Sequence, residues 1–249
     1  MFPLARMLGL FAAALIFSYR GGSVRVRLAI GMGVALALLP AMPAMPAVPP
    51  AAGIGLMIFV QQIFIGVAIG FMMRIVFATV DLAGALIGMQ MGLSFAIFFD
   101  PDAGGQTAVL SDFLALLTTL LFLAVNGHLL LIEVLVRSFE WLPIGTDMVR
   151  AQGWAYVARA GATVFAAGLL LALPVMGILL VANISLGVLT RAAPQLNLFA
   201  VGFPITLTAG FVGVLLMLTN FAPVLQSLFD GGFDDIGRML EMLAPLPPR

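Results

Sequence analysis

"AAGIGLMIFVQQIFIGVAIGFMM", residues 51–73, contains no charged side chain. A helix that crosses a membrane needs about 20 consecutive, mainly apolar residues, and this stretch meets that requirement. The whole chain has the same character, because 63% of its 249 residues are hydrophobic and 9% are charged. Soluble domains carry about 25% charged residues. The sequence therefore predicts an all-α, polytopic protein of the membrane type, built as one domain over residues 1–249.

Other hydrophobic helical segments lie on both sides of this stretch. They cover residues 1–19, 28–39, 82–99, 113–132, 160–190 and 198–222. The number of crossings is six or seven, depending on whether 82–99 crosses, and the positive-inside rule favours seven, with Arg6 and Arg191 outside. Residues 233–244 place apolar and charged side chains on opposite helix faces, which predicts an amphipathic C-terminal helix on a membrane or partner surface.

Several of the segments are interrupted by proline. Pro174 lies inside 160–190, Pro194 and Pro204 flank the start of 198–222, and Pro223 follows it. A proline in a helix frees a carbonyl that lipid cannot satisfy. Two interpretations remain open: ordinary kinked membrane helices, or a subunit whose helices are mostly covered by other subunits.

Glycines recur at four-residue steps in two of the segments. Gly66 and Gly70 form one pair, and Gly84, Gly88 and Gly92 form a longer row. Small residues at this spacing let another backbone approach closely. We interpret both rows as helix-packing interfaces, either within the chain or against a partner subunit or a polypeptide in transit.

A small acidic, glycine-containing loop follows the segment 82–99. Pro101 disfavours helix at the residue before it, and the two glycines make the loop permissive. The loop is either a plain connection or a mobile gate beside an apolar stopper. The residues concerned are Phe95, Phe98, Phe99, Asp100, Pro101, Asp102, Ala103, Gly104, Gly105 and Gln106.

Polar side chains within the apolar segments are the remaining candidates for chemistry. They are Arg74 and Asp81, then Asn126, His128 and Glu133, and then Arg191, Gln195 and Asn197 beside Pro194. Arg74 and Asp81 are seven residues apart on one helix face and either pair or bind neighbours, and Glu133 has Arg137 as an i,i+4 partner. His128 either hydrogen-bonds a neighbouring backbone group or relays protons. The residues beside Pro194 either cap the broken helices or contact another subunit. A proton-coupled carrier that uses Asp81, His128 and Glu133 is the alternative.

The composition excludes several classes of site. There is no Cys and one His, so disulfides, thiolate chemistry, cysteine metal sites and metal sites made of clustered histidines are excluded. The net charge is zero, which does not favour nucleic acid as a partner. No nucleotide loop, nucleophile triad or metal motif is present, so we expect no enzyme activity and no cofactor.

Two blocks carry a resemblance to a known family. "GLSFAIFFDPDAGGQTAVLSDFLALLTTLLFLAVNGHLLLIEVLVRSFEWLPIG" (92–145) resembles the central block of the FliR family of flagellar export-gate proteins, and "TRAAPQLNLFAVGFPI" (190–205) resembles its second signature. FliR proteins are related to the injectisome subunit SctT. The resemblance implies a structural, non-enzymatic subunit of the flagellar type III protein export gate.

The resemblance also implies an assembly and a location. One copy of a FliR-like chain joins several FliP-type and FliQ-type subunits in a helical pore complex, and an FlhB-type subunit associates with it. Unfolded flagellar proteins pass through this pore, which lies in the bacterial inner membrane, within the basal body and partly on the periplasmic side. Residues 98–106 then correspond to a plug loop that narrows the closed pore. The alternative is a self-contained, proton-coupled small-molecule transporter or channel.

Overall fold

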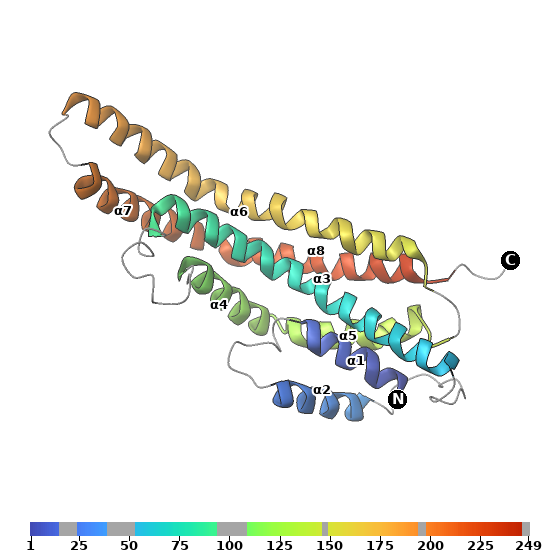
Figure 1. The fold of residues 1–249 in the computed structure, drawn as a ribbon. Helices are drawn as coiled ribbons and strands as arrows, with labels where there is room; N and C mark the ends of the chain where they lie inside the picture. Colours follow the sequence, from blue (N-terminus) through green and yellow to red (C-terminus); the bar gives the residue numbers. More distant parts are fainter. Residues whose placement is uncertain (15–23, 39–52, 94–108, 146–148, 194–197, 246–249) are drawn as a thin grey trace. The chain divides into compact units, whose positions relative to one another are not determined.

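The computed structural model describes residues 1–14, 24–38, 53–93, 109–145, 149–193 and 198–245 (Figure 1). Within these ranges the chain forms helices and short connections without any strand, which confirms the all-α fold class. The helices are α1 (Phe2–Ala13), α2 (Val24–Leu38), α3 (Gly53–Met91), α4 (Val109–Ala124), α5 (Gly127–Trp141), α6 (Ala151–Ala192), α7 (Leu198–Leu218) and α8 (Phe221–Leu243).

Helix α3 is longer than the sequence segments predicted. It has 39 residues and joins 51–73 to the first half of 82–99 without a break. The intervening residues, from Arg74 to Asp81, contain neither glycine nor proline. Two charged side chains shorten the apolar run, but they do not interrupt the helical backbone.

Two other predicted segments are each divided between helices. The segment 113–132 is interrupted after α4 at Asn126, which has a left-handed φ of 57°. The segment 198–222 contains α7 and the first residues of α8, with a turn at Thr219 and Asn220 between them. Pro174 and Pro204 lie inside α6 and α7 and do not end either helix. Pro223 is the third residue of α8, where a missing N–H leaves no intrahelical bond unmade.

The described residues contain fewer membrane-length helices than six or seven. By length and composition α3, α6 and Val201–Leu218 of α7 are able to cross a membrane, and the bent pair α4–α5 makes a fourth if it counts as one span. Helix α1 has 12 residues and is too short to span on its own. The sequence count was higher because it treated each apolar run as a separate crossing.

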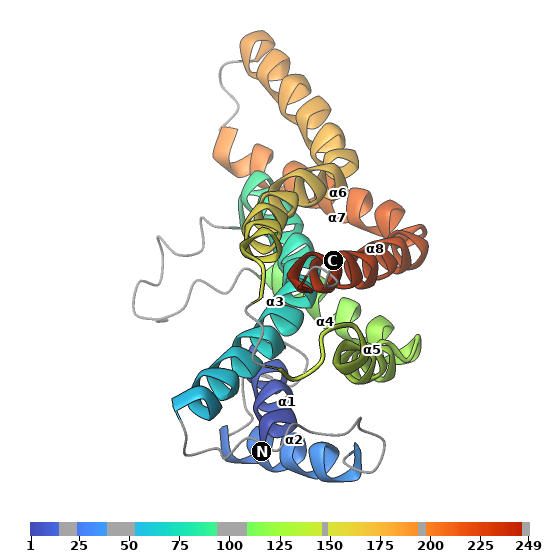
Figure 2. The same cartoon turned by 90° about the vertical axis from the view of Figure 1, so that its right-hand side faces the viewer.

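The chain divides into two compact units. Unit 1 contains residues 1–77, 122–162 and 228–249, and unit 2 contains 78–121 and 163–227. In unit 1, α1 lies between the start of α3 and α2 in both views (Figures 1 and 2). The side chain of Phe11 on α1 lies directly against Gly31 on α2.

The aromatic core of unit 1 joins α8 to the middle of α3 and the end of α4. The rings of Phe122 and Phe229 are 5.0 Å apart in an edge-to-face arrangement, and Phe77 and Phe233 lie against Phe122. Such pairs add about 0.5–1.5 kcal/mol to the burial of the rings themselves.

The apolar face of the C-terminal helix is buried in the same unit. Ile236, Met239, Leu240 and Leu243 have no exposed surface. The predicted amphipathic helix is therefore present. Its apolar face packs inside the chain, however, which corrects the expectation that it lies on a membrane or partner surface.

Unit 2 is organised around the second part of α3. Gly84 faces Ser111 on α4, Leu82 faces Gly168 on α6, and Met91 faces Gly210 on α7. Gly213 on α7 in turn lies against Val175 on α6. Glycines thus mark the places where these helices come closest.

Candidate functional site

The whole predicted gate loop lies outside the described residues. The undescribed range covers residues 94–108, and Pro194, Gln195 and Asn197 are not described either. The unplaced loop residues include all ten gate-loop candidates, Phe95, Phe98, Phe99, Asp100, Pro101, Asp102, Ala103, Gly104, Gly105 and Gln106. Before the loop, Gly92 has φ 83° and its N–H donates to the Met89 carbonyl at 3.1 Å. Since this conformation favours glycine, Gly92 ends the helix rather than extending the packing row.

The glycine pair Gly66 and Gly70 lies where α1 crosses α3. A Cβ on Gly66 would overlap the Arg6 carbonyl, and one on Gly70 would lie 2.9 Å from the Leu10 carbonyl oxygen. From the other helix, a Cβ on Gly9 would lie 2.5 Å from the Ile63 carbonyl oxygen. The two backbones are therefore in direct contact, and this pair packs within the chain.

The second glycine row meets α4, but its members are not equivalent. A Cβ on Gly84 would lie 2.6 Å from the Cα of Ser111, whereas one on Gly88 would meet nothing closer than 3.8 Å. Beside this crossing, the Ser111 hydroxyl donates to the Asp81 carbonyl at 2.8 Å. The close approach of α3 and α4 therefore depends on Gly84 and not on Gly88.

The strongest polar network lies around Arg6, which the sequence analysis treated only as a topological charge. Its Nε donates to Gln62 Oε1 at 2.8 Å. One terminal nitrogen donates to the Ser138 carbonyl and hydroxyl at 2.8 and 2.9 Å, and the other donates to the Leu142 carbonyl at 2.9 Å. The guanidinium carbon lies 4.2 Å from the ring centre of Phe139.

Arg6 is fully buried, and these partners are all electrically neutral. Burial lowers the pKa of Arg6 to about 9, so the side chain stays charged at neutral pH. Burying a charge is unfavourable unless hydrogen bonds replace its hydration. The network provides that replacement and links α1, α3 and the end of α5. A single Arg within the apolar run 1–19 was the sequence signal for it.

The candidates on α5 have different surroundings. Asn126 forms the left-handed residue before the helix, and its carbonyl accepts the Leu129 N–H at 2.9 Å. His128 lies in the first turn, and its buried Nδ1 has no hydrogen-bond partner among the described residues. Glu133 forms an ion pair with Arg137 at 2.7 Å, and both side chains are at least half exposed.

The remaining polar candidates are single residues on long helices. Arg74 is exposed and Asp81 is partly buried, both on α3, and Arg191 is exposed in the last turn of α6. Among the described residues, no three His, Asp or Glu side chains come together in a way that could hold a metal ion.

The comparison with known proteins accounts for nearly the whole chain. Residues 1–232 match the family model described as "Bacterial export proteins, family 1". The flagellar biosynthetic protein FliR of Pectobacterium carotovorum is 42% identical over 243 residues, which cover 97% of this chain and 92% of that protein. The chain belongs to the FliR family. The FliR protein of Escherichia coli K12 is also 42% identical, over 241 residues with the same coverage.

More distant FliR proteins retain much of the length. That of Bacillus subtilis is 26% identical over 186 residues, which cover 74% of this chain and 72% of the relative. The name "flagellar biosynthetic protein" describes no catalytic activity. Three helices within the described ranges are long and apolar enough to span, and together with family membership they indicate a membrane protein of flagellar export.

Proposed function

We propose that this FliR-family chain is a structural, pore-forming subunit of the flagellar type III protein export gate. It joins FliP-type and FliQ-type subunits, with an FlhB-type subunit alongside, and unfolded flagellar proteins pass through the assembly. The observation that carries this proposal is the 42% identity to flagellar biosynthetic proteins over nearly the full chain. The inner membrane, within the basal body and partly on its periplasmic side, is the proposed location.

The unequal burial of the long helices supports a role as one subunit among several. Of the 18-residue apolar stretch of α3 that is able to span a membrane, 67% is buried inside the chain. The corresponding stretches of α6 and α7 are each 22% buried. Large apolar side chains remain exposed on both, among them Phe165, Leu170, Val181, Phe211 and Leu215. Surfaces of this kind need lipid or other subunits as a cover.

We further propose that residues 98–106 form the plug that closes the pore. The left-handed Gly92 supports this, because it turns the chain out of α3 a few residues before the loop begins. A segment that seals a pore and then moves has to be connected to its helix by permissive backbone, which glycine supplies.

The mass of the intact particle tests the proposed function. After mild detergent extraction of the native complex, native mass spectrometry should show a large hetero-oligomer containing one copy of this 26.2 kDa chain. A monomer or a symmetric homodimer as the extracted particle would contradict the gate-subunit proposal. In that case the transporter that uses Asp81, His128 and Glu133 would become the leading hypothesis.

A further inference from the structure

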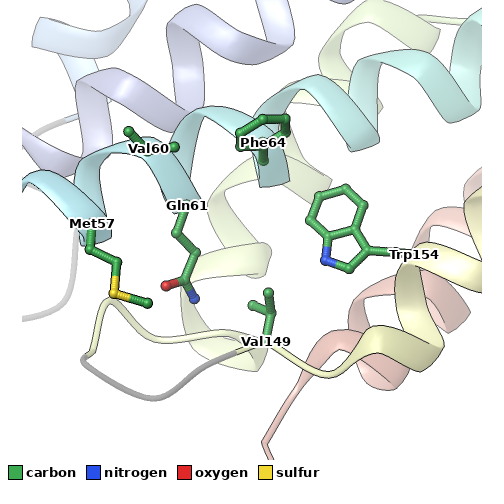
Figure 3. A pocket seen from close by; sticks show the side chains of 6 residues that line it. All are labelled: Met57, Val60, Gln61, Phe64, Val149 and Trp154. Atoms are coloured by element: carbon green, nitrogen blue, oxygen red, sulfur yellow. The ribbon is translucent and has the colours of Figure 1, made fainter.

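Helix α3 is held firmly in unit 1, where it begins. Gly66 and Gly70 bring its backbone into contact with α1. Nearby, the rings of Phe64 and Trp154 meet edge to face, with centres 6.1 Å apart. Figure 3 shows these two rings at the wall of an apolar hollow of about 420 Å³. The start of the helix is therefore fixed by backbone and aromatic contacts.

The part of α3 that belongs to unit 2 is also fixed at first through its backbone. A Cβ on Gly84 would lie 2.6 Å from the Cα of Ser111, whose hydroxyl donates to the Asp81 carbonyl at 2.8 Å. On α6, a Cβ on Gly168 would lie 2.9 Å from the Thr79 carbonyl oxygen. Helices α4 and α6 thus hold α3 at close range as far as Gly84.

The last turn of α3 is attached in a different way. A Cβ on Gly210 of α7 would lie 2.4 Å from the Cγ of Met91, so a side chain fills the space between these two helices. Met91 has no exposed surface. Methionine is unbranched and has three rotatable bonds, so it can leave and re-enter such a position with little strain.

The hydrogen bonds that tie this turn to α6 and α7 are long. Gln90 Nε2 donates to the Met176 carbonyl at 3.3 Å, and the Thr206 hydroxyl lies 3.4 Å from the Met91 carbonyl. Normal N–H···O bonds measure about 2.7–3.2 Å and O–H···O bonds about 2.5–3.0 Å. The Thr206 hydroxyl has one proton and lies closer to the Phe203 carbonyl of its own helix, at 3.0 Å. These bonds therefore contribute little to keeping the turn in place.

Gly88 lies between the fixed part of α3 and the weakly held turn. It is one turn after Gly84, and a Cβ on it would meet nothing closer than 3.8 Å. Glycine weakens a helix relative to alanine, and no described neighbour requires it at this position. Gly88 is therefore suited to be the point at which α3 bends.

We infer that the last turn of α3, residues 89–92, is a releasable contact of the export gate. It lies on α7 while the gate is closed and moves away, by bending at Gly88, when a polypeptide passes. On release, Met91 leaves its position against Gly210 and the two long hydrogen bonds break. The inference rests on the proposed function, because this turn is the last part of α3 before the segment that we propose as the plug.

A reversible cross-link tests the movement, since the chain contains no cysteine of its own. The test variant is Met91→Cys/Gly210→Cys. The Cβ of residue 91 is one bond from the Cγ that a Cβ at 210 would approach, so the two Cβ atoms lie within about 4 Å, as a disulfide requires. The matched control, Val175→Cys/Gly213→Cys, joins α6 to α7 in the same unit, where a Cβ on Gly213 would lie 3.0 Å from Val175 Cγ1.

The readout is the flagellar protein that cells carrying each variant release into the medium before oxidation, after oxidation and after reduction. Mass spectrometry after alkylation measures the cross-linked fraction. We expect oxidation to stop export in Met91→Cys/Gly210→Cys and reduction to restore it, whereas the control pair exports in both states. Export that continues while positions 91 and 210 are cross-linked would overturn the inference. Failure of the assembled pair to cross-link would also overturn it, because the turn would then not lie on α7.

A separate comparison in the same assay judges the proposed function itself. Cells with the unmodified chain should export flagellar protein, and cells that lack the chain should not. Export that persists without the chain would contradict the proposed function, whatever the cross-link does.

Gly88→Ala provides a second test that needs no cross-link, and it decides if the cysteine pair at 91 and 210 does not assemble. Because alanine stiffens the helix, it should lower the population of the released turn about fivefold. We expect slower export at a normal yield of assembled complex. An unchanged export rate would overturn the inference.

Discussion

Arg6 shows at the residue scale how an apolar unit accommodates a charge. Its four hydrogen bonds reach two segments that are distant in the sequence, α3 through Gln62 and the end of α5 through Ser138 and Leu142. A hydrogen bond to a charged group contributes about 1.5–3 kcal/mol, and an unpaired buried partner costs a similar amount. The side chain therefore links α1, α3 and α5.

Replacing Arg6 tests this description. Arg6→Ala leaves Gln62 and the Ser138 carbonyl unsatisfied, so we expect a loss of about 3 kcal/mol or more in stability. Arg6→Lys keeps a charge but loses the planar fork, so it should recover only part of the loss. The measurement is the thermal unfolding midpoint of the purified complex in detergent.

Arg137→Ala is the matched control for Arg6→Ala, because it removes an arginine from an exposed i,i+4 ion pair with Glu133. Such pairs contribute about 0.3–0.5 kcal/mol, so the midpoint should hardly move. Similar midpoints for Arg6→Ala and Arg137→Ala would show that the Arg6 network is not structural.

His128 separates the gate subunit from a proton-coupled transporter. Within the part of the chain that the structure describes, its buried Nδ1 has no hydrogen-bond partner, and Glu133 on the same helix is engaged in a surface ion pair. We expect His128→Gln to preserve flagellar export and swimming in soft agar, because glutamine is a neutral side chain of similar size and no described hydrogen bond is lost with the imidazole. Loss of export, together with a changed pH dependence, would favour a proton-relaying role.

At the scale of the helices, the packing depends on how closely α3 and α4 approach each other where they cross. Gly84 and Gly88 are one turn apart on α3, but only Gly84 lies against the α4 backbone. We expect Gly84→Ala to lower the yield of assembled complex, because the added methyl group forces α3 and α4 apart. Gly88→Ala should be neutral or slightly stabilising, since alanine favours helix by about 1 kcal/mol over glycine. Quantitative blotting of the purified complex measures both.

The order of these two effects is the informative result. Equal yields from Gly84→Ala and Gly88→Ala would mean that the close approach of Gly84 and Ser111 is not maintained in the assembled protein. A more severe defect at Gly88 would mean that this glycine faces a partner subunit instead of α4.

The proposed plug is tested by deleting part of its loop. Without residues 100–105 the closed gate should conduct small solutes, because the apolar stopper is no longer held across the pore. Secretion should survive in part, since the helices that form the pore remain. Conductance across planar bilayers and the amount of exported protein in the medium are the two readouts. An unchanged conductance would refute the plug assignment.

Exposed apolar surface is the main feature at the scale of the whole molecule. In each of α6 and α7, only 22% of the 18-residue apolar stretch is buried inside the chain. The chain contains no cysteine, so Val181→Cys introduces a unique thiol on the exposed side of α6. With a benzophenone maleimide attached there, we expect photo-cross-links to FliP-type or FliQ-type subunits. Exclusive labelling of lipid would show that this face borders the bilayer.

The sequence alone determined the class of the protein and its family. An uncharged stretch such as 51–73 has few stable forms other than an apolar helix, because backbone groups in lipid must be satisfied within the segment. The motifs at 92–145 and 190–205 were sufficient for the resemblance to FliR, which the comparison over residues 1–232 confirmed. The gate loop and the partners inferred from that resemblance stay predictions.

Only the tertiary structure decided where the segments end and what they contact. The apolar segments could not show that 51–73 and the first half of 82–99 belong to one continuous helix, or that Asn126 divides another segment. Spacing identified the glycine rows, but it could not separate Gly84 from Gly88, because the difference depends on a backbone far along the chain. The role of Arg6 was hidden for the same reason, since its partners lie 56 to 136 residues away. Contacts between distant residues have no local signature, so packing alone determines them.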